Sequence, residues 1–221
     1  MTTLLIATRN AHKVGEIQAM LGPAFRCLTL KEYPGAPAVV EDADTFSGNA
    51  TKKAVALAKW LAAQPTGQLV DFVLADDSGL EVDALNGEPG VHSARFAALD
   101  KDENAPDADN NAKLMRLLQG VPLEKRTARF RCVIALATVT APAKTNASPV
   151  CYAEDDGVQL FDGACEGRIQ AVASGGGGFG YDPLFIPNGH EQSFAELGEA
   201  VKNKISHRAN AMAKLRVFLG V

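Results

Sequence analysis

The chain has 221 residues, of which 47% are hydrophobic and 22% charged, and its formal net charge is -4. This length and composition are typical of one soluble domain, or of two lobes that share a core. The negative charge argues against broad, sequence-independent binding of nucleic acid, which requires a basic surface. No apolar run approaches the length of a membrane span, and the amino-terminal segment lacks the basic region of a signal peptide. We therefore expect a cytoplasmic protein that binds any small polyanion at a local site.

A strand, a polar turn and a helix open the chain. The run Leu4–Ala7 predicts a short strand, and apolar residues then recur at the spacing of an amphipathic helix. The turn contains Thr8 and Asn10, and Lys13 lies in the first helical turn, where a cation opposes the helix dipole. A phosphate bound at the helix amino terminus would explain that lysine. The alternative, which these residues alone favour, is an ordinary connection with an exposed lysine.

The next unit of the chain predicts a strand at Phe25–Leu28 and then a helix with a stripe of small apolar residues. Thr45 is the predicted amino-terminal cap of that helix, and Glu41 belongs to a group of acids just before it. Asn49 and Lys53 lie one turn apart and would share a face. Because acids near a helix amino terminus stabilise it electrostatically, capping is a strong structural alternative to a functional role for Glu41.

The central stretch begins with an apolar strand, Phe72–Leu74, and continues into Asp76, Asp77 and Ser78. We expect the strand to end at the two acids. In open α/β sheets, ligands bind at the carboxyl ends of strands. Paired carboxylates there suit a hard divalent cation such as Mg²⁺, which shares phosphate oxygens. The alternative is an Asp-rich turn, and the two interpretations carry equal weight when these residues are taken alone.

The second half of the chain alternates between polar loops and apolar segments. In order, we predict a loop at 99–109, a short helix at 112–118, a long strand at 129–139, a hairpin loop at 140–149, a strand at 150–153, a turn with a short strand at 162–167, a strand at 184–186, and a closing helix at 205–219.

Four glycines, Gly175 to Gly178, lead directly into Phe179, Gly180, Tyr181 and Asp182. Glycines let the main chain approach a ligand closely, an aromatic ring could stack on a base, and the acid could accept a hydrogen bond from a ring N–H. A flexible linker is the alternative. We favour a binding loop, because the run continues into a core strand.

Basic residues gather before the carboxyl terminus, at Lys202, His207 and Arg208. In an acidic chain this is a concentrated positive site, suited to a phosphate or to a purine carbonyl. The alternative is the solvated start of a helix, and charge alone does not separate the two.

These stretches occur as an ordered set of motifs. The set comprises Thr8-x-Asn10-x-x-Lys13, Glu41 ahead of Thr45-Phe46, Asn49-Ala50-x-x-Lys53-Ala54, Ala75-Asp76-Asp77-Ser78-Gly79-Leu80, Pro89-Gly90-Val91-x-Ser93-Ala94-Arg95-Phe96, Ala128-x-Phe130-x-Cys132, Gly177-x-Phe179-Gly180-Tyr181-Asp182-Pro183 and Ile205-Ser206-His207-Arg208. Together they resemble the inosine triphosphate pyrophosphatase family over nearly the whole chain. The resemblance implies an α/β fold: one domain, residues 1–221, with a long twisted mixed sheet, flanking helices and two lobes around a central nucleotide cleft. It also implies a homodimer.

The activity implied by the resemblance is Mg²⁺-dependent hydrolysis of non-canonical purine nucleoside triphosphates (dITP, ITP and XTP) to the monophosphate and pyrophosphate. In this interpretation Asp77 is the general base or positions the water. Asp77, Glu41 and Asp76 form the metal shell. The phosphates are bound by lysines assisted by the first turn and Ser78: Lys13, Lys53 and Lys202, with Thr8 and Asn10.

The resemblance also implies how the base is recognised. Phe179 stacks on it, and Gly180, Tyr181 and Asp182 shape the pocket. A donor aimed at O6, either His207 or Arg208, would favour the keto form and leave adenine badly paired. Arg95 completes the implied substrate-binding set. Two rival functions remain: a phosphohydrolase acting on another small phosphorylated compound, and a nucleotide-binding protein without turnover.

Overall fold

The computed structural model describes the whole chain except residues 65–68, 99–102 and 140–156. It divides into two compact units, one of Met1–Asp77, Val133–Phe161 and Leu215–Val221, the other of Ser78–Cys132 and Asp162–Lys214. The six-stranded sheet has the order β2-β1-β3-β4-β5-β6. Three strands contribute residues to both units: β3 (Phe72–Val82), β4 (Thr127–Thr138) and β5 (Val158–Ile169). The predicted α/β class, with a mixed sheet and flanking helices, is confirmed.

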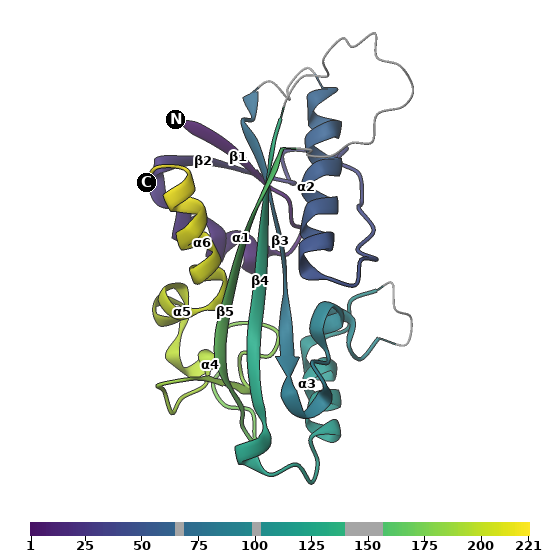
Figure 1. Cartoon of the computed structure of the whole chain (residues 1–221), viewed down its shortest axis with the longest axis vertical. Coiled ribbons are helices and arrows are strands. Elements are labelled where there is room, and N and C mark those ends of the chain that lie inside the picture. Colours follow the sequence, from purple (N-terminus) through teal and green to yellow (C-terminus); the bar gives the residue numbers. More distant parts are fainter. Residues whose placement is uncertain (65–68, 99–102, 140–156) are drawn as a thin grey trace. The chain divides into compact units, whose positions relative to one another are not determined.

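The first unit is built on three parallel strands. β1 (Thr2–Ile6) pairs with β2 (Phe25–Thr29) on one side and with β3 on the other. The chain moves to β2 through α1 (Ala11–Leu21), then back past β1 to β3 through α2 (Phe46–Ala62). Because such crossovers are right-handed, opposite directions of travel place the two helices on opposite faces. Figure 1 shows α1 and α2 on either side of these strands.

The second unit contains most of the short elements. They are η3 (Asp83–Leu85), η4 (Gly90–Arg95), α3 (Asp107–Leu117), η5 (Leu123–Lys125), β6 (Phe185–Pro187), α4 (Phe194–Leu197), α5 (Glu199–Ile205) and α6 (His207–Phe218). The last residues of α6 belong to the first unit, as does η1 (Gly22–Ala24). β6 is antiparallel to β5. Phe130, Phe185 and Phe194 pack together in its core, with ring centroids of Phe130 and Phe185 4.7 Å apart.

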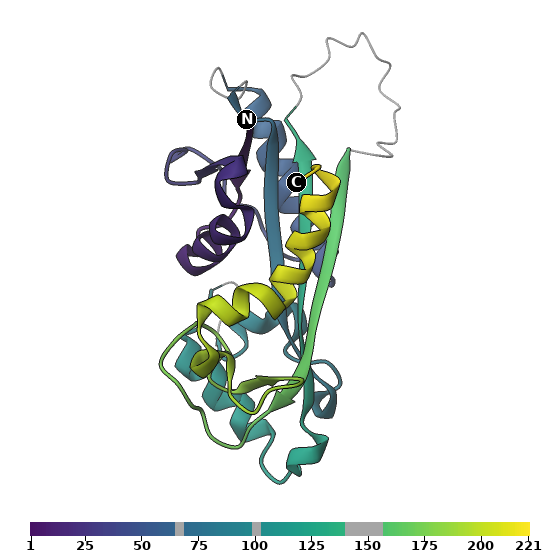
Figure 2. The ribbon, with the colours of Figure 1, turned by 90° about the vertical axis from the view of Figure 1, so that its left-hand side faces the viewer.

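Helix α6 runs alongside β5, as Figure 2 shows. The approach is close because β5 carries a glycine there: a Cβ on Gly163 would lie 2.1 Å from the carbonyl oxygen of His207 and 2.5 Å from the backbone nitrogen of Ala211. The expectation of a turn at 162–167 is therefore wrong. Its glycines serve close backbone approach within a continuous strand, not a reversal of the chain.

Three further boundaries differ from expectation. β3 does not end at Asp76 and Asp77 but continues to Val82. The closing helix predicted at 205–219 is α6, which begins two residues later, at His207: Ile205 ends α5, and Ser206, with extended backbone, accepts a hydrogen bond at its Oγ from the Ala209 N–H. The predicted loop at 99–109 ends earlier, since α3 begins at Asp107. The hairpin loop and strand predicted at 140–153 lie outside the described residues. Within the described ranges, no helix combines the length and apolar composition needed to cross a membrane.

Candidate active site

Two lysines hold the central acids of the first unit. Lys13 Nζ lies 2.6 Å from Asp76 Oδ1, and the Asp76 carboxylate is fully buried. Lys53 Nζ donates to Glu41 Oε2 at 2.8 Å and to the backbone oxygen of Asp76 at 2.7 Å, and lies 3.5 Å from Asp77 Oδ1. The structure thus brings together five of the predicted site residues, from α1, α2, β3 and the segment before α2.

The different partners of the two acids follow from the geometry of the strand. Successive residues of a strand point to opposite faces of the sheet. Asp76 pairs with Lys13 on α1 and Asp77 with Lys53 on α2, the two helices that cover opposite faces. The pairing explains why acids are tolerated inside β3: each buried carboxylate has a cation nearby. The alternative of an Asp-rich turn is wrong.

Short polar side chains shape the segments that carry these groups. Asn10 caps α1, and its Oδ1 accepts hydrogen bonds from the N–H groups of His12 and Lys13, while Thr8 Oγ1 accepts from the Asn10 N–H. Asn49, almost fully buried, bonds both the N–H and the carbonyl of Ala43. Asn49 therefore positions the segment that bears Glu41.

The predicted cap of α2 is confirmed, since Thr45 Oγ1 accepts a hydrogen bond from the Gly48 N–H at 3.1 Å. Of the acids before this helix, Glu41 is bonded to Lys53 and so belongs to the buried cluster. Capping alone therefore does not account for Glu41.

Asp77 is the electrostatically strained member of the cluster. Burial raises its pKa from the ordinary 3.8 to about 6; the nearby charges of Lys53 and Lys13 lower it, and those of Glu41 and Asp76 raise it. Its second oxygen, Oδ2, is buried and has no hydrogen-bond partner in the described part of the chain. A buried carboxylate oxygen left without a donor is suited to a hard cation, and Glu41 supplies a second oxygen donor beside the same lysine. Among described residues, no group of three or more acids, histidines or cysteines is already arranged to hold a metal ion.

The glycine-rich segment of the second unit is held by a buried ion pair. Asp182 Oδ2 accepts hydrogen bonds from Lys202 Nζ at 2.5 Å and from the Phe179 N–H at 2.8 Å. The Lys202 ammonium also lies 4.4 Å from the centre of the Phe179 ring. A Cβ on Gly178 would lie 2.2 Å from the same Asp182 oxygen. The flexible-linker alternative is therefore wrong at this end of the segment, which packs tightly around a carboxylate.

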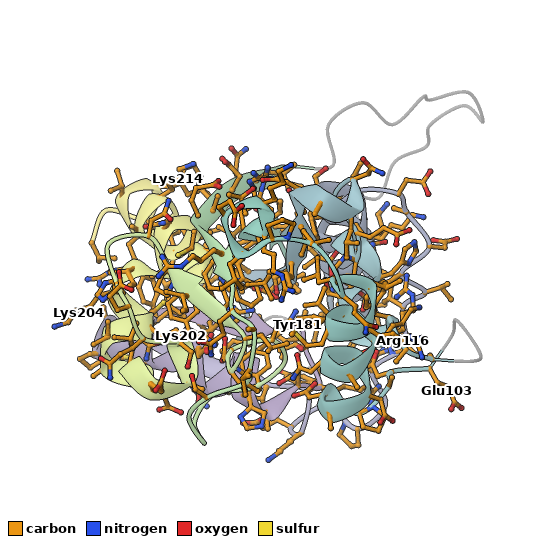
Figure 3. All side chains as sticks on the ribbon, turned by 90° about the horizontal axis from the view of Figure 1, so that it is seen from below. Glu103, Arg116, Tyr181, Lys202, Lys204 and Lys214 are labelled. Carbon is orange, nitrogen blue, oxygen red and sulfur yellow. The ribbon has the colours of Figure 1, made fainter. Side chains whose placement is uncertain are left out.

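Lys202 belongs to this aromatic site, whereas Lys13 and Lys53 belong to the first unit. Figure 3 shows Lys204 projecting outward from α5, while Lys202, only 2% exposed, is turned inward. The alternative of a solvated helix start is wrong for Lys202.

His207 and Arg208 have different surroundings. The His207 ring stacks on Phe130 at a centroid distance of 4.8 Å. Arg208 donates from Nη2 to Ser78 Oγ at 2.9 Å, and its guanidinium carbon lies 6.0 Å from the centre of the Phe179 ring. Arg208 thus joins two predicted substrate-binding residues, and His207 packs into the aromatic core.

Tyr181 is anchored from behind. It is 4% exposed, its hydroxyl donates to the backbone oxygen of Ser93 at 2.9 Å, and burial raises the pKa of its phenol. Ser93 Oγ in turn accepts from the Leu80 N–H and donates to the carbonyl of Gly90. Arg95 is half-buried at the end of η4.

Sequence reasoning missed two residues of this site, Asp107 and Asn111. Both bond the backbone of Gly180. Asp107 falls in the loop predicted at 99–109, and Asn111 lies between that loop and the helix predicted at 112–118, although their spacing of four residues is the signal of a shared helix face.

The fold and the side chains define a class of α/β protein known from solved structures. A HAM1 protein from Coxiella burnetii has a TM-score of 0.77 and 34% identity, over 99% of this chain and 98% of that one. A chain described as nucleoside-triphosphatase / dITP/XTP pyrophosphatase, from Mycobacterium abscessus, has a TM-score of 0.69 and 33% identity, over 97% of this chain and 98% of that one.

The sequence identifies the family. The model of the Ham1 family matches residues 4–218, and the chain belongs to that family. A protein of Desulforamulus reducens named dITP/XTP pyrophosphatase is 48% identical, over 98% of this chain and 94% of its own length. Another protein of that name, from Geobacter sulfurreducens, is 45% identical over 100% of this chain and 98% of its own length. The family predicted from the motifs is confirmed.

Proposed function

We propose that the protein hydrolyses non-canonical purine nucleoside triphosphates, dITP, ITP and XTP, to the monophosphate and pyrophosphate. The names of its relatives and its membership of the Ham1 family support this activity. The observation that carries the proposal is Asp77: a buried carboxylate with an unsatisfied oxygen, next to two lysines that suit a polyphosphate.

Mg²⁺ is the proposed cofactor, with Glu41 and Asp77 as its carboxylate ligands. Asp76, the third acid predicted for the metal shell, is paired with Lys13 in the structure. This ion pair favours an indirect role for Asp76 over direct metal binding. When bound, Mg²⁺ would neutralise charge on the triphosphate oxygens and lower the pKa of a coordinated water.

The chain's own residues then supply binding and proton transfer. Lys13 and Lys53 would bind phosphate oxygens. To do so, each ammonium group would give up some of its contacts with the carboxylates and form contacts with the substrate in their place. Asp77 would orient the attacking water and accept its proton, a role open to a carboxylate that stays ionised beside the cation. Thr8 and Asn10 would hold the turn that carries Lys13.

The second unit would recognise the base. Stacking on Phe179 and hydrogen bonding from Arg208 account for binding of a 6-keto purine, because Arg208 already lies beside that ring and donates to Ser78. An amino group at C6, as in adenine, would leave the guanidinium donor unpaired, and an unpaired buried donor discriminates strongly. His207, stacked on Phe130, would support Arg208 from the core. The contacts of Lys202 with Asp182 and Phe179 support a place near the base for that lysine.

Three further expectations complete the proposal. The two units would act as one domain, because three strands run through both. The protein would form a homodimer in the cytoplasm. Sedimentation velocity would test the dimer, and a monomer over the micromolar range would contradict it.

The decisive experiment is to measure pyrophosphate release from dITP, XTP, dATP and dGTP with and without Mg²⁺. We expect Mg²⁺-dependent release from dITP and XTP and much slower release from dATP and dGTP. Orthophosphate in place of pyrophosphate would contradict cleavage between the α- and β-phosphates. Nucleotide binding without any release would contradict enzymatic activity.

A further inference from the structure

Helix α3 bonds both the N–H and the carbonyl of Gly180. Gly180 belongs to residues 175–183, the glycine-rich segment that carries Phe179 and Tyr181 and is called the aromatic segment below. The Gly180 N–H donates to Asp107 Oδ2 at 2.6 Å, and Asn111 Nδ2 donates to the Gly180 carbonyl at 3.0 Å. Asp107 and Asn111 are four residues apart and so lie on one face of the helix. All three residues belong to the second unit.

Gly180 is where the direction of the aromatic segment is set. The backbone φ of Gly180 is +62°, in the left-handed region that residues other than glycine rarely adopt. Gly180 lies between Phe179 and Tyr181 in the chain. Phe179 is fixed through its N–H to Asp182, and Tyr181 through its hydroxyl to Ser93. The two bonds from α3 fix the peptide groups between these anchors. A change at α3 would therefore rotate Phe179 relative to Tyr181.

Asn111 is an unfavourable residue for folding alone. Its Oδ1 is buried and, in the described part of the chain, has no hydrogen-bond partner. A buried acceptor without a donor destabilises the fold, whereas an apolar side chain of similar size would not. Asn111 therefore provides a hydrogen bond to the Gly180 carbonyl at a cost in the free energy of unfolding.

We propose that Asp107 and Asn111 are positioning residues that set affinity and selectivity for the base by holding Gly180. This inference rests on the proposed function. The two residues would act through the backbone of the aromatic segment, whereas the proposed triphosphate-binding residues Lys13 and Lys53 belong to the other unit.

The kinetic test compares Asp107→Ala and Asn111→Ala with Asp109→Ala. Asp109 is the matched control, because it is the other acid in the first turn of α3 and its removal weakens the helix dipole interaction equally. We expect Asp107→Ala and Asn111→Ala each to raise KM for dITP about tenfold, the effect of losing one hydrogen bond, with kcat little changed. Asp109→Ala should behave as wild type. Asp107→Asn should recover most of the loss, because its amide oxygen still accepts from the Gly180 N–H.

Inorganic tripolyphosphate separates positioning of the base from general damage. It has no base, so its inhibition constant should be the same in the wild type and all variants. If its inhibition constant rises in parallel with KM for dITP, the variants disturb the whole enzyme and the proposal is wrong. The proposal is equally wrong if Asp107→Ala and Asp109→Ala are indistinguishable.

A measurement independent of activity is hydrogen exchange of the peptide covering 175–183. Exchange should be faster in Asp107→Ala and Asn111→Ala than in the wild type, and unchanged in Asp109→Ala. Equal exchange in all of them would refute the hold on Gly180. If the wild type released no pyrophosphate from any purine triphosphate, the proposed function would fail, and exchange would still decide whether α3 fixes this segment.

Discussion

Replacing Asp77 by Asn should stabilise the metal-free protein while removing its activity. Burial raises the pKa of Asp77 from 3.8 to about 6, so the folded protein carries a carboxylate that would be more stable in water. At about 1.4 kcal/mol per pH unit, that difference corresponds to roughly 3 kcal/mol of stability lost at neutral pH. Asn has nearly the same volume and no charge, so the variant avoids the loss.

The pH dependence has a definite sign. Because the folded-state pKa of Asp77 is raised, its ionisation opposes folding: the penalty is absent below about pH 4 and complete above about pH 6. The gain from Asp77→Asn should therefore be largest at pH 7.5 and should disappear near pH 4. For a protein of this size, roughly 3 kcal/mol corresponds to an increase of roughly 6–12 °C in Tm.

The assay is thermal and urea unfolding in EDTA at pH 7.5 and pH 4, with Asp76→Asn as the matched control. Asp76 is paired with Lys13 at 2.6 Å, so its replacement should destabilise the protein, by about 2 kcal/mol, where the neighbouring replacement stabilises it. A decrease in Tm for Asp77→Asn, equal at both pH values, would refute the reasoning that burial strains this carboxylate.

Other predictions concern the same two units. Lys53→Met should lower the free energy of unfolding by about 3 kcal/mol at pH 7.5, because it leaves the buried Asp77 carboxylate without its nearest cation. The loss should be smaller at pH 5, where Asp77 takes up a proton. Urea unfolding at both pH values would show whether that difference exists. Gly178→Ala should destabilise the protein by about 1–3 kcal/mol and raise KM for dITP, because the new Cβ would meet the Asp182 carboxylate. Gly176→Ala is the control: a Cβ at Gly176 has open space, so neither stability nor KM should change. Equal behaviour of the two variants in unfolding and kinetics would contradict tight packing at Gly178. Mg²⁺ should raise the Tm of the wild type and not that of Asp77→Asn; an equal shift in both would place the metal elsewhere.

The sequence determined the elements whose signals are local. The parallel strands at the start, the cap at Thr45 and the two helices of the first unit follow from apolar periodicity and capping chemistry, and the structure contains them. The ordered motifs also identified the family and most residues of the two clusters. Such signals are readable because each depends on residues within one or two turns of the chain.

Only the tertiary structure decided where polar residues could be buried. Asp76 and Asp77 look like the end of a strand, yet β3 continues through them because lysines from two helices neutralise them. Gly163 resembles a turn residue but lies in β5, where α6 packs against its backbone. Asp107 reads as part of a loop but bonds Gly180, 73 residues away. Each case depends on a partner distant in sequence, and local propensity yields when such a partner satisfies a charge, a hydrogen bond or a close contact.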